Sequence, residues 1–86
     1  MAKVLMYGTR HCSYCRMAEK LLDKKGVQLK KVMVDDDRAR RDEMIQLTGR
    51  ISVPQIIIDD KHVGGYQELA ALAHSGRLDA LLKIKP

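Results

Sequence analysis

The sequence has few aromatic residues: it contains no tryptophan, no phenylalanine and three tyrosines among its 86 residues. Three isolated aromatics provide no stacking platform for nucleic-acid bases, and the lysines and arginines are spread along the whole chain. We therefore interpret the net charge of +5 as a solvated basic surface and expect no nucleic-acid partner. Such a surface also suits a small anionic substrate or an acidic protein partner.

Long hydrophobic runs are also missing. No stretch approaches the roughly 18 apolar residues of a membrane-spanning helix, and residues 1–8 lack the apolar run and cleavage site of a signal peptide. We therefore expect a cytoplasmic protein that does not contact a membrane. Hydrophobic residues make up 45% of the chain, enough for a core without a metal or a disulfide framework. We expect residues 1–86 to form a single domain and the protein to be a monomer.

Cysteine is scarce as well, since the chain has two, Cys12 and Cys15, three positions apart. Two cysteines are too few for a secreted scaffold that is stapled by disulfides. Haem attachment requires a histidine directly after the second cysteine, where this chain has Arg16. A structural zinc site requires four ligands, but there is no second cysteine pair and the three histidines are scattered. The pattern therefore favours a redox pair, and we expect no metal.

Hydrophobic periodicity predicts eight elements in the order strand, helix, strand, helix, strand, strand, helix, helix. The strands are expected at 4–7, 28–34, 55–59 and 62–64, with a turn at 60–61. The helices are expected from 13 to a stop at Gly26, around 44–47 with an end near Gly49, over 66–74 and around 78–82. A strand–helix–strand start implies a parallel pair, and the later strand–turn–strand segment implies an antiparallel hairpin. The predicted fold class is α/β, with a mixed four-stranded sheet flanked by helices in a thioredoxin-like arrangement.

The cysteine pair lies where the first predicted strand is followed by the first helix. Cys12 is expected in the first turn of that helix, where unpaired backbone N–H groups and the positive end of the helix dipole stabilise a thiolate. Cys15 lies one turn deeper on nearly the same face, within disulfide reach. Arg10, His11 and Arg16 add positive charge nearby. These features predict an exposed, activated first thiol and a shielded second one.

Four stretches together resemble the glutaredoxins, specifically the small bacterial dithiol type. They are Cys12–Cys15, Ser52–Gln55, Ile58–Asp59 and Gly64–Tyr66, and their order and spacing match the family over essentially the whole chain. The resemblance implies a glutathione-dependent thiol–disulfide oxidoreductase with glutathione as co-substrate and with disulfide-containing or glutathionylated proteins as partners. It also implies that Cys12 attacks the substrate disulfide and that Cys15 resolves the intermediate.

The resemblance further implies a glutathione groove beside Cys12. Val53 would hydrogen-bond the cysteinyl backbone of glutathione, a cis Pro54 would face the Cys12 sulfur, and Tyr14 would border the groove. From the residues alone, Pro54 is also consistent with an ordinary proline at the first residue of a strand, because proline has no N–H to donate.

The start of the predicted third helix would hold the γ-glutamyl end of glutathione. Exposed N–H groups there favour an anion, although a glycine pair before a helix is also consistent with a plain turn. By the resemblance, Gly65–Gln67 would receive the carboxylate and Glu68 the ammonium group. The glycine carboxylate would fall to Arg10 or to an arginine of the second helix, because Thr9 stands where the family commonly has lysine.

Two alternatives remain open. Ser13 replaces the proline that the family commonly has, and such variants resemble members that carry a [2Fe–2S] cluster. In that case two protomers would each donate Cys12, and two glutathione sulfurs would complete the four thiolates. The other alternative is a redoxin that is reduced by thioredoxin reductase. Thioredoxin itself is disfavoured because that family usually carries tryptophan before its first cysteine, and this chain has none.

Overall fold

All eight predicted elements are present, in the predicted order, in a computed structural model that describes residues 2–84. The strands are β1 (Val4–Gly8), β2 (Leu29–Met33), β3 (Gln55–Ile58) and β4 (Lys61–Gly64). The helices are α1 (Ser13–Lys24), α2 (Arg38–Thr48), α3 (Tyr66–Ser75) and α4 (Arg77–Leu81). Among these residues, no helix is both long enough and apolar enough to cross a bilayer.

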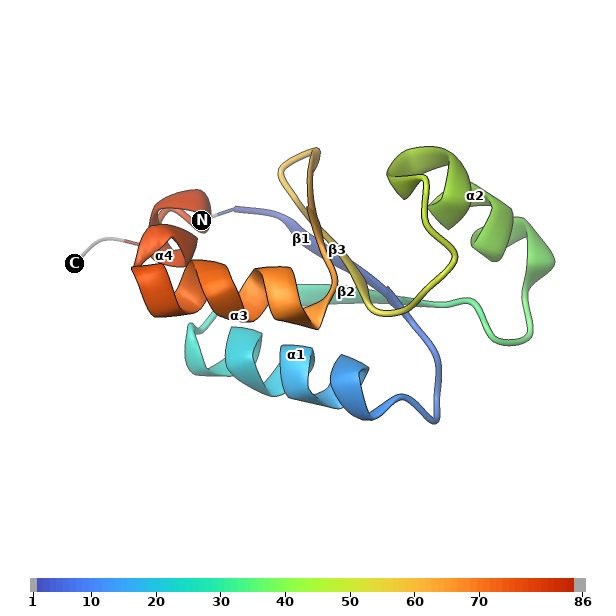
Figure 1. The fold of residues 1–86 in the computed structure, drawn as a ribbon, viewed down its shortest axis with the longest axis horizontal. Helices are drawn as coiled ribbons and strands as arrows, with labels where there is room; N and C mark the ends of the chain where they lie inside the picture. Colours follow the sequence, from blue (N-terminus) through green and yellow to red (C-terminus); the bar gives the residue numbers. More distant parts are fainter. Residues whose placement is uncertain (1, 85–86) are drawn as a thin grey trace.

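The strands form one sheet in the order β2-β1-β3-β4. Figure 1 shows α1 and α3 side by side and α2 apart from them. β1 runs parallel to β2 and antiparallel to β3, and β3 runs antiparallel to β4. This mixed sheet, with one parallel pair and a final hairpin, confirms the predicted α/β architecture. The chain leaves β1 at Gly8 and enters α1 at Ser13, so the two cysteines lie at the carboxyl end of a central strand.

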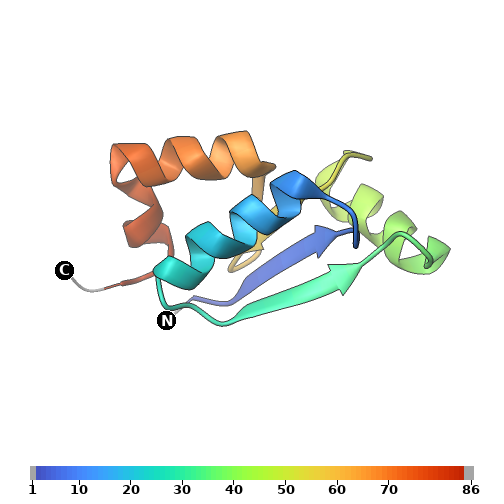
Figure 2. The same cartoon turned by 90° about the horizontal axis from the view of Figure 1, so that it is seen from below.

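The two faces of the sheet carry cores of different size, because successive residues of a strand point to opposite faces. On one face, Val4 and Met6 of β1 join the large core formed with α1, α3 and α4. On the other face, Tyr7 joins a small core with Val34 and with Met44 of α2. Figure 2 shows α1 and α3 on one side of the sheet and α2 set apart from them, beyond the arrowheads of β1 and β2.

The turn between β3 and β4 lies one residue earlier than predicted. Asp59 and Asp60 both have positive φ, 46° and 68°, as the central residues of a two-residue hairpin turn require. Aspartate tolerates this conformation better than most residues other than glycine. Asp59 Oδ1 also accepts the backbone N–H of Lys3 at 2.8 Å, which ties the turn to the start of β1. β4 therefore begins at Lys61 and not at His62.

Candidate active site

Cys12 is the N-cap residue of α1, in an extended conformation with φ −123° and ψ 108°. Its sulfur accepts a hydrogen bond from the backbone N–H of Cys15 at 3.1 Å, so it occupies the place of a capping oxygen. The sequence predicted Cys12 in the first turn, and the structure places it one position earlier, where the unpaired N–H groups of the helix point. A thiolate at this position is stabilised by that N–H and by the positive end of the helix.

Cys15 lies beneath Cys12, inside the protein. Its exposed fraction is 5%, and its Cα lies 5.2 Å from that of Cys12, with the two sulfurs joined as a disulfide. Gly8 makes this burial possible, because a Cβ at Gly8 would lie 3.1 Å from the Cys15 sulfur. The periodicity of the sequence does not single out Gly8. A glycine at the end of a buried strand, just before a Cys-x-x-Cys helix, is the signal that identifies it.

The segment opposite the cysteines contains the cis peptide bond that the resemblance implies, between Val53 and Pro54. The carbonyl oxygen of Val53 lies 3.9 Å from the sulfur of Cys12, so this segment faces the redox pair. Within residues 2–84, the N–H and C=O of Val53 form no backbone–backbone hydrogen bond. Both groups are available to an extended peptide, which would pair with them as an added strand pairs with a sheet edge.

A groove of about 310 Å³ runs from this segment to the start of α3. The rings of Tyr14 and Tyr66 lie together at one side, with centroids 5.9 Å apart and planes inclined by 31°. Every residue that the resemblance assigns to glutathione lines the groove except Arg10, and the structure adds Arg50 and Ser52. The lining residues are Tyr14, Arg50, Ser52, Val53, Pro54, Gly65, Tyr66, Gln67 and Glu68.

Arg10 is held away from the groove by the acidic segment that follows β2. Its Nε donates to Asp35 Oδ2 at 2.9 Å, and its terminal nitrogen forms an ion pair with Asp36. The side-chain hydrogen bond from Arg10 lowers the pKa of the Asp35 carboxyl below its ordinary value. The structure therefore assigns Arg10 to fixing the loop before Cys12, with its charge matched by two aspartates.

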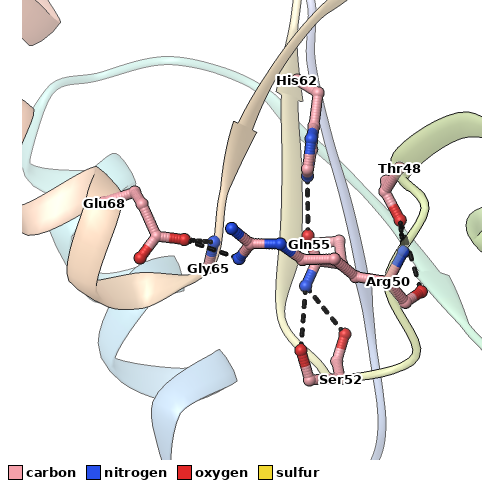
Figure 3. A network of polar contacts seen from close by, with 7 residues as sticks. All are labelled: Thr48, Arg50, Ser52, Gln55, His62, Gly65 and Glu68. Atoms are coloured by element: carbon pink, nitrogen blue, oxygen red, sulfur yellow. Dashed lines mark hydrogen bonds and ion pairs between the residues drawn. The ribbon is translucent and has the colours of Figure 1, made fainter.

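Glu68 lies in the first turn of α3, and its carboxylate accepts hydrogen bonds from groups of the protein itself (Figure 3). Its Oε1 accepts the backbone N–H of Gly65 at 2.8 Å and a hydrogen bond from the Arg50 guanidinium at 2.8 Å. These two donors, the Gly65 N–H first, lower the pKa of the Glu68 carboxyl. Gly64 must be a glycine, because its φ is 122° and a Cβ there would collide with the Glu68 carboxylate. Sequence patterns did not identify Arg50, which follows α2 and reaches the groove only through the fold.

A metal site and a second hollow are the alternative locations for a site within residues 2–84. No group of three or more histidine, cysteine, aspartate or glutamate side chains in this part of the chain is arranged to hold a metal ion. A larger hollow of about 1410 Å³ lies at the opposite end of the sheet, around Lys3, Leu29 and Asp59. The smaller groove is the candidate site because Val53, which lines it, lies 3.9 Å from the Cys12 sulfur through its carbonyl oxygen, whereas no residue next to the cysteines lines the larger hollow.

The glutaredoxin family model matches residues 4–63, which include the cysteine pair and the cis-proline segment. The chain belongs to the glutaredoxin family. Its mixed sheet is thus the thioredoxin-like sheet of glutaredoxins, and Cys12 and Cys15 form the redox-active pair of the family motif. The resemblance drawn from the four sequence stretches is confirmed.

Several known glutaredoxins match this glutaredoxin over nearly all of its residues. Glutaredoxin 3 of Escherichia coli K12 is 47% identical over 83 residues, spanning 96% of this chain and 100% of the relative. The solution structure of glutaredoxin from Brucella melitensis has a TM-score of 0.84 at 40% identity, covering 96% of this chain and 90% of that one. The crystal structure of a buckwheat glutaredoxin–glutathione complex has a TM-score of 0.86 at 26% identity. The match covers 95% of this chain and 77% of the buckwheat chain.

Proposed function

We propose that this glutaredoxin is a glutathione-dependent oxidoreductase that reduces protein disulfides and glutathionylated proteins. The observation that carries the proposal is the position of the Cys12 sulfur. It caps α1, receives the Cys15 N–H at 3.1 Å and lies 3.9 Å from the carbonyl oxygen of Val53. A sulfur that is stabilised as a thiolate and lies beside a peptide-binding edge suits attack on a disulfide within a peptide. The buckwheat relative, whose structure is a glutathione complex, supports glutathione as that peptide.

Reduction of a glutathionylated protein needs Cys12 alone. The Cys12 thiolate attacks the glutathionyl sulfur, a new S–S bond forms, and the target protein leaves as a thiolate that takes up a proton. A second glutathione, as its thiolate, then attacks the glutathionyl sulfur on Cys12. Oxidised glutathione leaves, and the Cys12 thiolate is restored.

Reduction of a disulfide within a protein needs both cysteines. Attack by Cys12 leaves it tethered to one substrate sulfur, while the other substrate sulfur leaves as a thiolate. Cys15, with its Cα 5.2 Å from that of Cys12, then attacks the Cys12 sulfur and releases the substrate. The resulting Cys12–Cys15 disulfide is reduced by two glutathiones, which leave as oxidised glutathione.

The groove supplies a partner for each end of glutathione. The Val53 N–H and C=O pair with the cysteinyl backbone, and the first N–H groups of α3 receive the γ-glutamyl carboxylate. Both contacts of Glu68 within residues 2–84 use Oε1, which leaves Oε2 to accept the ammonium group. Arg50 lines the groove, whereas Arg10 and the arginines of α2 do not, so we assign the glycine carboxylate to Arg50 in place of those residues.

Paired turnover assays test the proposal with wild type, Cys12→Ser and Cys15→Ser. Each protein is given a glutathionylated peptide and an intramolecular protein disulfide, with glutathione and glutathione reductase as the electron source. Cys12→Ser should lose both activities. Cys15→Ser should keep the first and lose more than about tenfold of the second, because a tethered resolving thiol has a high effective concentration.

Two results would contradict the proposal. Loss of both activities in Cys15→Ser would remove the one-cysteine route. Turnover that runs with thioredoxin reductase and not with glutathione would favour the redoxin alternative. A visible spectrum after anaerobic purification checks the cluster alternative in the same preparation.

A further inference from the structure

Gln55 is the one fully buried polar side chain among residues 2–84, with an exposed fraction of 0%. A buried amide is costly unless its donors and acceptor are paired. Its Nε2 donates to the carbonyl oxygen of Ser52 at 2.9 Å and to the Ser52 hydroxyl at 3.2 Å. Its Oε1 lies 2.7 Å from Nε2 of His62, on the neighbouring strand β4 (Figure 3). The amide therefore links β4 to the segment before the cis proline.

The direction of each hydrogen bond in this chain is fixed by chemistry. The Ser52 carbonyl can only accept, so the amide nitrogen of Gln55 must face it and the amide oxygen must face His62. Nε2 of His62 must then carry the hydrogen and donate it. Uptake of a second proton on Nδ1 leaves this donor in place, so the link exists for both charge states of the ring.

The Ser52 carbonyl and the Val53 N–H belong to the same peptide group. That bond is trans, since Val53–Pro54 is the cis bond found among the described residues, and in a planar trans peptide the C=O and N–H point in opposite directions. Holding the Ser52 carbonyl toward buried Gln55 therefore turns the Val53 N–H away from the core. Val53 lines the groove, so its N–H is presented there.

We propose that Gln55 and His62 are positioning residues that aim the Val53 N–H at the peptide backbone of the bound substrate. The inference rests on the proposed function, because it assigns to these residues the orientation of the peptide edge. His62 donates to Gln55, Gln55 anchors Ser52, and the Ser52–Val53 peptide plane is set as a result. His62, which touches neither the groove nor the cysteines, thereby acts on substrate recognition from the far strand of the hairpin.

The test compares His62→Phe with His62→Gln. Both replacements are uncharged, and only glutamine restores an N–H at a similar reach, so the pair isolates the donor. His74→Phe, at an exposed histidine of α3 outside the groove, is the matched control. For a glutathionylated peptide, kcat/KM should fall about threefold to tenfold in His62→Phe, the effect of one lost hydrogen bond, and should recover in His62→Gln. His74→Phe should match wild type.

A second substrate distinguishes a misplaced Val53 N–H from a general loosening of the active site. The rate at which reduced Cys12 reacts with 2,2′-dithiodipyridine, which has no peptide backbone, should be the same in wild type and His62→Phe. If His62→Phe does not fold, His62→Ala takes its place with the same expected loss.

If the wild-type protein turns over the glutathionylated peptide, three results would overturn the inference. They are an unchanged kcat/KM in His62→Phe, equal losses in His62→Phe and His62→Gln, and an equal slowing with dithiodipyridine. Absence of turnover in the wild type is a different result, and it removes the proposed function together with the inference.

Discussion

At the scale of the residue, the Cys12 sulfur has a backbone hydrogen-bond donor, whereas the nearest arginine is engaged with two aspartates. The Cys15 N–H donates to the Cys12 sulfur, whereas Arg10, two residues before it, is matched by Asp35 and Asp36. A hydrogen bond to the charged form and a helix N-terminus both favour the thiolate. The nearest arginine therefore adds less than its position in the sequence suggests.

The first prediction concerns the pKa of this thiol. In Cys15→Ser, thiolate absorbance against pH should give Cys12 a pKa well below the free-thiol value of about 8.5. Asp35→Asn should lower that pKa further, because it releases part of the Arg10 charge toward the sulfur. Asp23→Asn, at an exposed aspartate near the other end of α1, is the control and should leave the titration unchanged. An ordinary pKa for Cys12 would contradict the N-cap assignment.

Most residues that line the groove were expected from short motifs, but Arg50 was not, and neither were most of the side-chain partners. Cys12, Val53 and the start of α3 belong to short motifs, and local chain geometry places each of them. The partners of Arg10 and Glu68 come from loops 25 and 18 residues away, and no periodic pattern specifies which charged side chain of a loop will meet another. The anchoring role of Gln55 depends in the same way on strand register, which places His62 beside it.

At the scale of elements, the ends of α2 and α3 were predicted closely because glycine follows each helix. The start of α2 at Arg38 was missed, since the sequence signalled this helix only around residues 44–47. Gly49 and Gly76 take the left-handed conformation at the ends of α2 and α3, with φ of 70° and 81°. Asp37 caps α2 by accepting the Arg40 N–H at 3.0 Å. The hairpin turn was misplaced by one residue because aspartate, unlike glycine, gives no strong signal of positive φ.

The second prediction concerns the cap of α3. Glu68→Gln should reduce the free energy of unfolding at pH 7 by roughly 0.5 to 1 kcal/mol, mainly through the Gly65 N–H, since an exposed ion pair adds little. The pKa of Glu68 is lowered in the folded protein below its ordinary value of 4.5. The stabilisation is thus complete above that value and is lost as the pH falls through the folded pKa.

Urea unfolding of wild type and Glu68→Gln at pH 7 and at acidic pH measures this effect, and the difference should shrink in acid. Glu19→Gln is the control, because it removes a surface ion pair with Lys31 at 3.0 Å but no helix cap. Its effect should be within about 0.5 kcal/mol. A Glu68→Gln difference that is equal at both pH values would contradict the capping role of the carboxylate.

At the scale of the whole molecule, the two faces of the sheet carry hydrophobic cores of very different size. The large core holds buried residues from α1, α3 and α4, whereas α2 contributes one buried side chain, Met44. A hydrogen bond from the Tyr7 hydroxyl to Glu43 at 2.7 Å also ties α2 to β1. Burial first, and then this hydrogen bond to Glu43, raise the pKa of Tyr7 to about 12. Arg50 lies two residues after the end of α2, so the side of the molecule with the small core supplies a residue that lines the groove.

The third prediction follows from this asymmetry. Met44→Ala should cost about 2 to 5 kcal/mol of unfolding free energy, because it leaves a cavity under a helix with no other buried anchor. Leu47→Ala, in the same helix but with an exposed fraction of 57%, should cost no more than about 0.5 kcal/mol. In native-state hydrogen exchange of Met44→Ala, the amides of α2 should lose protection before those of α1 and β1, since local unfolding follows local packing. Equal loss of protection in α1 and α2 would instead show that the two cores unfold as one unit, and Arg50 would then be held as firmly as the cysteines.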